Sequence, residues 1–162
     1  MSIVRVDIGM KNVSIEELRP QYRMLGARGL VSTLVADEVN PGCDPLGREN
    51  KVIFAPGLLG GTIVPSSSRT SLGTKSPLTG GIKESSAGGP GGADLAKLGI
   101  NALIIEGYPQ DDRWYYLKID NNGTQILPAD DLVGLGCYDT SRKLRKIHGE
   151  KCSVFVIGQA GE

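Results

Sequence analysis

Hydrophobic and polar residues alternate at the start of the chain with the period of a β-strand. Val4, Val6 and Ile8 fall on one face, and charged residues lie between them. A turn follows, and residues 13–15 are predicted to return as the second strand of a hairpin. The pattern then changes to helical spacing, which predicts a helix over residues 21–38. Its apolar stripe consists of Leu30, Val31, Leu34 and Val35.

Short apolar runs between turn residues predict further strands. They cover residues 51–55, 70–74, 101–106, 114–119, 124–127 and 153–157. Two further helices are expected at 93–98 and 140–148, each closed by a glycine. Asp139 or Thr140 is the expected N-cap of the second of these helices.

The order of these expected elements repeats along the chain. A hairpin, a polar link, a helix and a buried strand occur first within residues 4–57 and again after residue 114. We therefore predict two related halves that share one core, within a single domain over residues 1–162. Chance similarity of the element order is the alternative, because the two sequences have diverged.

Composition and charge exclude several classes of function. Lys and Arg total 18, as do Asp and Glu, so the net charge is zero and no nucleic-acid footprint is evident. A basic cluster at residues 142–146 is better explained as the solvated face of the last helix. No apolar run approaches the length of a membrane span, and no signal pattern opens the chain. We therefore expect a cytoplasmic protein without a membrane or nucleic-acid partner.

Candidate catalytic and metal-binding side chains are few. Cys43, Cys137 and Cys152 are far apart, and no CxxC pair occurs, so this chain alone shows no zinc or iron–sulfur ligand set. His148 is the one histidine, and its place on a helix with an apolar stripe favours a structural role. We therefore predict no catalytic residue on this chain.

The most unusual stretch is the glycine-rich segment, defined here as residues 55–92. Gly, Ser, Thr and Pro dominate it, so its backbone can approach a ligand closely and direct many N–H groups at it. Arg69 offers a bidentate fork for phosphate, and Lys75 a second positive charge. Residues 88–92 precede an expected helix start, which is typical of anion sites. One interpretation is a large phosphorylated cofactor, and the other is a surface flap with Arg69 in an ordinary ion pair.

Five blocks of sequence carry a more specific signal. They are LGARGL (25–30), DPLGRENKVIFAPGLLGGT (44–62), TKSPLTGGIKESSAGG (74–89), LGINALIIEG (98–107) and IGQAGE (157–162). In this order they resemble the N-terminal domain of the tungsten-dependent aldehyde ferredoxin oxidoreductase family. The resemblance covers essentially the whole chain, and several of the blocks are specific to that family.

The resemblance implies a fold and a cofactor. The fold is α+β, with two β-sheets, a few flanking helices and an intertwined internal duplication. The cofactor is a tungsten (or molybdenum) bis-pterin, a tungstopterin or molybdopterin whose phosphates are bridged by magnesium. Arg69 takes the place of a cofactor-binding arginine, and Ser86, Ala87, Gly88 and Gly89 that of a segment that contacts pterin and magnesium. Ser86 stands where the family usually has asparagine, so only a main-chain carbonyl contact to magnesium is retained.

Members of that family continue beyond the IGQAGE block. Their remainder supplies cysteines for a [4Fe–4S] cluster, further pterin contacts and the substrate pocket. The resemblance therefore implies a cofactor-cradling domain that C-terminal domains or a partner subunit complete, with ferredoxin as the electron acceptor of the full enzyme. The full enzyme would oxidise aldehydes to carboxylic acids, and the isolated chain is expected to be inactive. The alternative is a non-catalytic scaffold or partner-binding subunit that keeps the fold without the cofactor.

Overall fold

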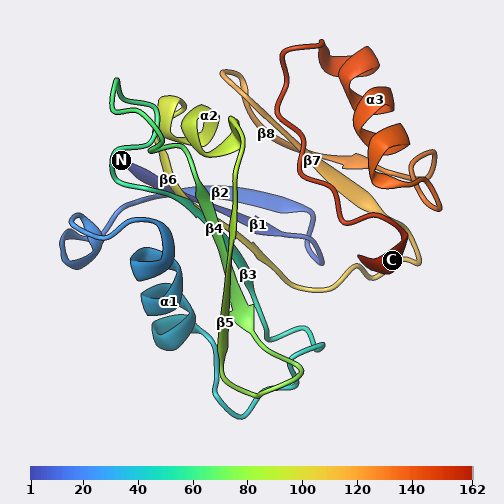
Figure 1. Cartoon of the computed structure of the whole chain (residues 1–162). Helices are drawn as coiled ribbons and strands as arrows, with labels where there is room; N and C mark the ends of the chain where they lie inside the picture. Colours follow the sequence, from blue (N-terminus) through green and yellow to red (C-terminus); the bar gives the residue numbers. More distant parts are fainter. Residues whose placement is uncertain (162) are drawn as a thin grey trace. The chain divides into compact units, whose positions relative to one another are not determined.

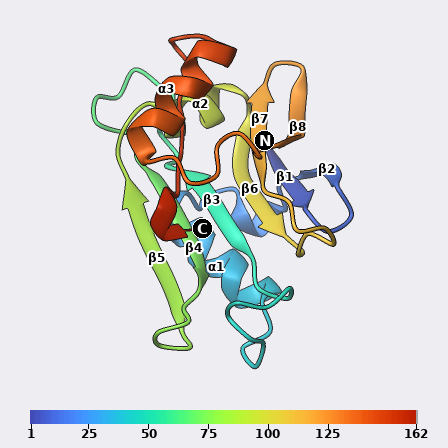
Figure 2. The same ribbon diagram turned by 90° about the vertical axis from the view of Figure 1, so that its right-hand side faces the viewer.

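A six-stranded sheet is the centre of the first of two compact units in the computed structural model, which describes residues 1–161 (Figures 1 and 2). This unit comprises Met1–Gln110, and the second begins at Asp111. The sheet order is β2-β1-β6-β3-β4-β5. The strands are β1 Ser2–Asp7, β2 Asn12–Glu17, β3 Val52–Pro56, β4 Thr70–Lys75, β5 Ile82–Ala87 and β6 Ile100–Glu106. Strands β1 and β6 are parallel, and the other neighbours are antiparallel.

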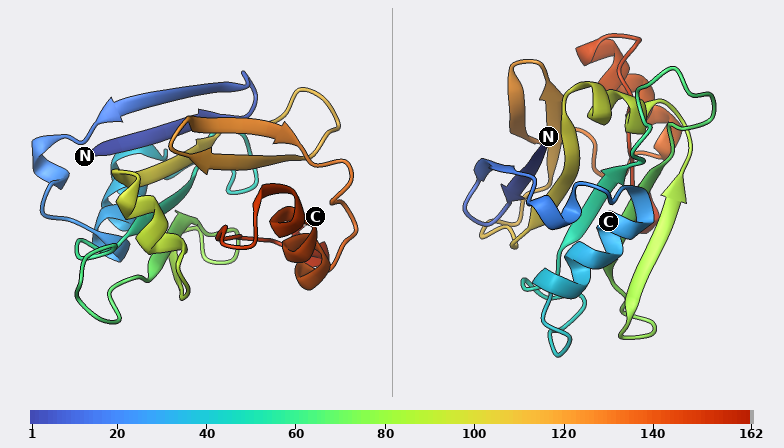
Figure 3. Two further views of the ribbon diagram at one scale, coloured as in Figure 1. Left: turned by 90° about the horizontal axis from the view of Figure 1, so that it is seen from above. Right: turned by 90° about the vertical axis from the view of Figure 1, so that its left-hand side faces the viewer.

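Helix α1, Ala27–Glu38, covers one face of this sheet near β3, β4 and β5 (Figure 3, right). The predicted stripe is confirmed, because Leu30, Val31, Leu34 and Val35 are all buried. They form the core with strand residues that include Ile53, Ala102 and Ile104. Full burial of one such aliphatic side chain contributes about 1.5–3 kcal/mol, so this face holds the unit together.

A close approach at Gly73 fixes how α1 sits on the sheet. A Cβ atom placed on Gly73 of β4 would overlap Cγ1 of Val31. Gly73 is not among the glycines with positive φ, so only this steric contact requires it. The helix therefore needs glycine at this point of the strand.

The helix predicted over residues 21–38 is interrupted in the structure. Residues Pro20–Tyr22 form a 3-10 turn, and α1 begins only at Ala27. Gly26 is the extended N-cap between them, with φ −150°. Glycine lowers helix propensity, and the extended backbone of Gly26 separates the 3-10 turn from α1.

The glycine-rich segment contains a hairpin that was only half predicted. Strand β4 was expected, but β5 was not, because the sequence IKESSA lacks the apolar alternation of a half-buried strand. β5 is the edge strand of the sheet, and most of its residues are exposed. The turn between the two strands contains Gly80, whose φ of +71° favours glycine.

Charged residues from three strands, from α1 and from the residue before β3 form an ion-pair network, which we call the Arg5 network. Arg5 donates from Nε to Glu16 at 2.8 Å and from Nη1 to Glu38 at 3.0 Å and Glu106 at 3.1 Å. Lys51 Nζ lies 2.9 Å from Glu38 Oε2 and 2.8 Å from Glu106 Oε2. The five side chains therefore connect β1, β2 and β6 with the C-terminal end of α1 and the start of β3.

The Arg5 network shifts the pKa values of Glu16, Glu38 and Lys51 toward their charged forms. The hydrogen bond from Arg5 lowers the pKa of Glu16. Burial opposes ionisation of Glu38, but hydrogen bonds from Arg5 and Lys51 outweigh it and hold that pKa below its ordinary value. Burial also opposes the charge of Lys51, yet its hydrogen bonds to Glu106 and Glu38 raise its pKa.

The second unit consists of a hairpin and a helix. The hairpin is β7 Tyr115–Asp120 with β8 Gly123–Pro128, and Gly123, with φ +115°, is the first residue after the turn. Helix α3 spans Cys137–His148, so its N-cap is Gly136 and the predicted caps at 139 and 140 are wrong. His148 lies 3.1 Å from the Tyr116 hydroxyl and is partly buried, which agrees with the structural role expected of it.

The final strand predicted at residues 153–157 is wrong. Residues 152–158 have no regular secondary structure, and Phe155 and Ile157 are 44% and 64% exposed. An apolar run becomes a strand only where a neighbouring strand continues the ladder, and neither sheet of the described residues includes this segment. The order of hairpin then helix therefore occurs in both units, whereas the fourth element of the predicted repeat occurs only in the first.

The α+β fold with two sheets and a few helices is confirmed. The prediction of a single domain over residues 1–162 stays a prediction. Among residues 1–161, none of the helices has the length and apolar content that crossing a bilayer requires.

Candidate functional site

The candidate site lies where β4 begins and β5 ends, next to the start of α2, Gly91–Lys97. Antiparallel pairing places Thr70 opposite Ala87 and Ser71 opposite Ser86. Arg69 precedes β4 and residues 88–90 follow β5, so the predicted cofactor residues come together at one end of the strand pair. We call this the open end of the β4–β5 pair.

Arg69 and Ser86 contact each other across this open end. Arg69 Nε donates to the Ser86 hydroxyl at 2.9 Å, and Nη2 donates to the Ser86 carbonyl at 3.3 Å. The structure therefore joins two residues that the sequence assigned to the same cofactor for separate reasons. The Ser86 carbonyl has two lone pairs, so one acceptor direction remains beside the arginine contact.

Gly88 and Gly89 leave open space in front of this pair. A Cβ atom at either position would meet no atom within 4 Å. Gly89 has φ +103°, a conformation that favours glycine. Ala87, the last residue of β5, is partly buried, whereas Ser86 before it and Gly88 and Gly89 after it are exposed.

Helix α2 packs closely on the backbone of residues 68–70. A Cβ atom on Gly92 would lie 2.7 Å from Oγ1 of Thr70 and 3.2 Å from the carbonyl carbon of Arg69, and would overlap the Ser68 carbonyl oxygen. Thr70 itself is buried. The backbone that carries Arg69 is therefore held against α2, while its side chain is exposed.

Lys75, predicted as a second charge for a ligand, is buried instead. Its Nζ donates to the carbonyl oxygens of Pro41 at 2.6 Å and Cys43 at 2.5 Å. Asn50 strengthens the same connection, because its amide donates to the Lys75 carbonyl and its Oδ1 accepts from the Lys75 N–H. The ammonium thus joins the 41–50 loop to the far end of β4 and does not reach the open end.

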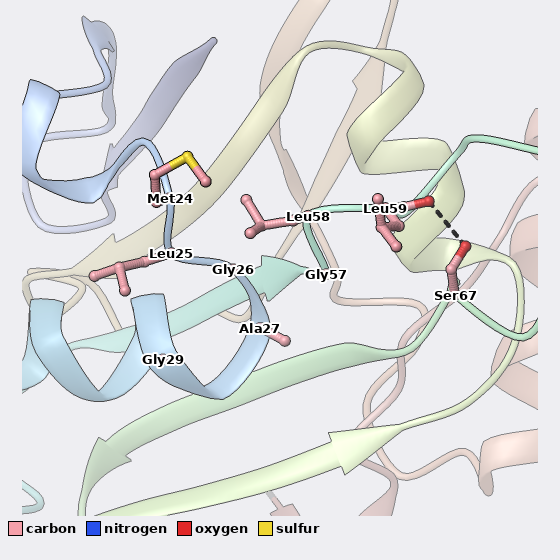
Figure 4. Close-up of a pocket in the computed structure, with 9 residues that line it drawn as sticks. All are labelled: Met24, Leu25, Gly26, Ala27, Gly29, Gly57, Leu58, Leu59 and Ser67. Carbon is pink, nitrogen blue, oxygen red and sulfur yellow. Dashed lines mark hydrogen bonds between the residues drawn. The ribbon is translucent and has the colours of Figure 1, made fainter. Parts of the chain in front are cut away.

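An apolar hollow that the sequence analysis did not predict lies at the start of α1 (Figure 4). It is lined by residues 24–27, 29, 57–59 and 67. Gly26 is required here, because a Cβ atom on it would lie 2.6 Å from the Leu58 backbone nitrogen. The only signals in the sequence were the glycines of LGARGL and GLLGG, which indicate close backbone contacts but not which segments meet.

The loop beside this hollow exposes large apolar side chains. It is held by Ser67, whose hydroxyl oxygen lies 2.8 Å from the carbonyl oxygens of both Leu59 and Val64, which share its one hydrogen. The exposed apolar residues of the loop and of the facing segment are Met24, Leu58, Leu59, Ile63 and Val64. Such a group is more than scattered surface residues and is typical of a surface that another protein segment covers.

Comparison with known proteins gives the decisive observation. The family model described as "Aldehyde ferredoxin oxidoreductase, N-terminal domain" matches residues 3–162. The chain belongs to this family. The resemblance inferred from the five sequence blocks is therefore confirmed.

Named relatives of this family domain are much longer than the chain. A tungsten-containing aldehyde ferredoxin oxidoreductase of Thermococcus kodakarensis is 37% identical, and that of Pyrococcus furiosus 36%. Each match covers 98% of this chain but 26% of the relative. A more distant relative is the aliphatic sulfonate oxidoreductase, WOR-like subunit, of Pyrococcus furiosus, at 27% identity over 99% of this chain and 28% of the relative.

A solved structure agrees with the fold of this family domain. It is the active site complex BamBC of benzoyl coenzyme A reductase with 1,5-dienoyl-CoA. It matches with a TM-score of 0.86 and 30% identity, covering 93% of this chain and 23% of the other. The fold therefore also occurs in the active site complex of benzoyl coenzyme A reductase.

The open end of this family domain fits a phosphorylated pterin in its donor chemistry. Arg69 has five N–H donors, and Ser86 accepts two of them. The backbone at Gly88 and Gly89 carries no side chains that would block a flat ligand. Among residues 1–161, no three His, Cys, Asp or Glu side chains gather as a metal-ligand set.

Proposed function

We propose that this chain is the cofactor-cradling portion of a tungstopterin (or molybdopterin) oxidoreductase. One observation carries the proposal: Arg69 and Ser86 are hydrogen-bonded directly beside the uncovered backbone of Gly88 and Gly89. A fixed cation beside bare main chain suits a ligand that is both flat and anionic. The tungsten-containing relatives indicate which ligand of that kind to test.

The bound cofactor would supply two-electron redox chemistry at its metal. The residues of this chain would bind and orient it. Arg69 would hold a phosphate by charge-assisted hydrogen bonds, and Gly88 and Gly89 would let the pterin approach the backbone together with Ala87. The Ser86 carbonyl would contribute one oxygen ligand to a bridging magnesium, an ion that prefers oxygen ligands.

The remaining parts of the reaction belong to protein outside the matched quarter of the relatives. We infer that C-terminal domains or a partner subunit provide the [4Fe–4S] cluster, the substrate pocket and the contact with ferredoxin for electron transfer. The exposed residues Leu58, Leu59 and Ile63 support this, because they form an apolar surface that such a portion would cover. The full protein would then oxidise an aldehyde to a carboxylic acid.

A scaffold without cofactor is the second candidate function. The observation that favours it is Ser86, which lacks the side-chain amide expected at this position and directs its hydroxyl to Arg69. A chain that kept the fold and the apolar loop, but not the cofactor, would bind a partner through that loop alone.

Native purification with bound partners separates the two functions. Tungsten and molybdenum are measured by mass spectrometry, and pterin is measured by fluorescence after release. About one metal atom with pterin per complex supports the cofactor function, whereas a complex with neither supports the scaffold.

The variant Arg69→Ala tests the site within that experiment. We expect it to lower the metal and pterin content, whereas Arg142→Ala, which removes an exposed arginine from α3, should not. Equal cofactor content in Arg69→Ala and the unmodified protein would contradict the assignment of Arg69.

A further inference from the structure

We infer that Ser86 is a positioning residue, whose hydroxyl fixes the direction of the Arg69 guanidinium before a phosphate binds. The inference rests on the proposed function, since it concerns how the same arginine meets the cofactor's anionic group. It assigns a role to the Ser86 side chain, in addition to the main-chain contact proposed for this residue.

The first step is the geometry of the contact. The 2.9 Å bond from Nε and the 3.3 Å bond from Nη2 both end on Ser86, so they use one edge of the guanidinium. The three other N–H donors of Arg69 have no hydrogen-bond partner among residues 1–161. The inner edge is therefore occupied, and the outer edge is available for a tetrahedral anion.

The second step is the cost of holding an exposed arginine. Arg69 is exposed, and a free arginine side chain loses much rotamer freedom when it binds a ligand. A side chain that is already held loses less, so its affinity for the anion is higher. Ser86 can hold the Arg69 side chain because the pairing of β4 with β5 places Ser86 opposite Ser71. Ser71 is two residues after Arg69, so Ser86 lies close to the arginine.

The third step is the backbone beneath the arginine. Gly92 of α2 lies against the carbonyl carbon of Arg69 and Oγ1 of Thr70, so the Arg69 backbone cannot shift toward α2. The backbone and the inner guanidinium edge are thus fixed by different elements. The Arg69 side chain can therefore still rotate, and the bond from Nε to the Ser86 hydroxyl is the contact that restrains this rotation.

Nuclear magnetic resonance of the chain tests the position of Arg69 directly. A hydrogen-bonded Nε–H exchanges slowly with water and gives a sharp signal, whereas a free one exchanges rapidly. We expect Ser86→Ala to speed up exchange of the Arg69 Nε–H and Ser86→Thr, which keeps the hydroxyl, to restore the slow rate. Ser85→Ala is the matched control, because successive side chains of a strand point to opposite faces. An unchanged Arg69 signal in Ser86→Ala would overturn the inference.

Titration with inorganic phosphate tests the consequence for binding. We expect Ser86→Ala to bind phosphate about five- to tenfold more weakly, the loss typical of one hydrogen bond of ordinary strength. Ser86→Thr and Ser85→Ala should bind as the unmodified chain does. If Ser86→Ala also binds as tightly, Ser86 does not position Arg69 for an anion.

The variant Arg69→Ala separates failure of this inference from failure of the proposed function. If Arg69→Ala leaves phosphate binding unchanged, the proposed role of Arg69 toward the cofactor phosphate is wrong, whatever the Nε–H signal shows. If Arg69→Ala abolishes binding and Ser86→Ala does not weaken it, the proposed function stands and the positioning role of Ser86 is wrong.

Discussion

The strand pair β4–β5 uses glycine in two opposite ways. At Gly73, under α1, the missing side chain makes room for Val31, and the two elements pack without a gap. At Gly88 and Gly89, beyond the open end, the missing side chains leave empty space. Glycine content alone therefore does not distinguish a packing contact from a binding surface. The atoms nearest to each glycine make this distinction.

The largest effect should come from filling the packed position. Gly73→Ala places a methyl group on Cγ1 of Val31, and we expect a loss of about 1–3 kcal/mol in the free energy of unfolding. Urea unfolding measures the loss. The double variant with Val31→Ala should recover part of it, since the two residues interact. Additive losses in the double variant would mean that Val31 is not the residue with which the added methyl group clashes.

A second test removes one charge from α1, the helix that packs on Gly73. Glu38→Gln at the end of α1 takes an acceptor from both Arg5 and Lys51, and we expect a loss of about 1–2 kcal/mol. Glu17→Gln is the matched control, because Glu17 is exposed and bonds Arg23 at 3.3 Å. An equally large loss in Glu17→Gln would show that the burial of the Arg5 network does not increase its contribution to the free energy of unfolding.

The pH dependence of unfolding sharpens this test. The pKa values of Glu16 and Glu38 are lowered in the folded state, so the unfolded state binds protons first as the pH falls. Their stabilisation is present above the ordinary value of 4.5 and is lost as the pH falls through the lowered values. Unfolding followed from pH 6 to pH 3 should show a smaller loss in Glu38→Gln than in the unmodified chain.

The smallest effect on stability is expected at the open end. Gly88→Ala meets no atom within 4 Å, and we expect a change in the free energy of unfolding within about 0.5 kcal/mol. The same change should lower the pterin and metal content of the natively purified protein, because the added methyl group stands in the proposed cradle. If Gly88→Ala is destabilised, Gly88 is a packed position like Gly73. If it keeps its full cofactor content, Gly88 is not part of the cofactor site.

Much of the first sheet could be predicted because its residues follow simple periods. Val4, Val6 and the apolar run at 101–106 each predicted a strand that the structure contains. β5 was missed, since an exposed edge strand held by its register with β4 needs no apolar alternation. The run at 153–157 failed for the converse reason, because apolar residues alone do not supply a neighbouring strand.

The candidate site was predictable in its residues but not in its contacts. Arg69 and Gly88 were found because charge and bare backbone are visible in sequence. The bond between Arg69 and Ser86 depends on strand register, which the sequence did not specify. Lys75 was misjudged because nothing in its own surroundings along the chain shows that the carbonyls of Pro41 and Cys43 enclose it.

The enclosed Lys75 has a consequence for the conditions under which the first unit stays folded. A positive charge surrounded by carbonyl oxygens is the arrangement that proteins also use to bind potassium. Here the cation is part of the chain, so it cannot dissociate when the ionic composition of the medium changes. The loop that Asn50 and Lys75 hold against β4 is therefore fixed by groups of the chain itself, without a disulfide or a bound ion.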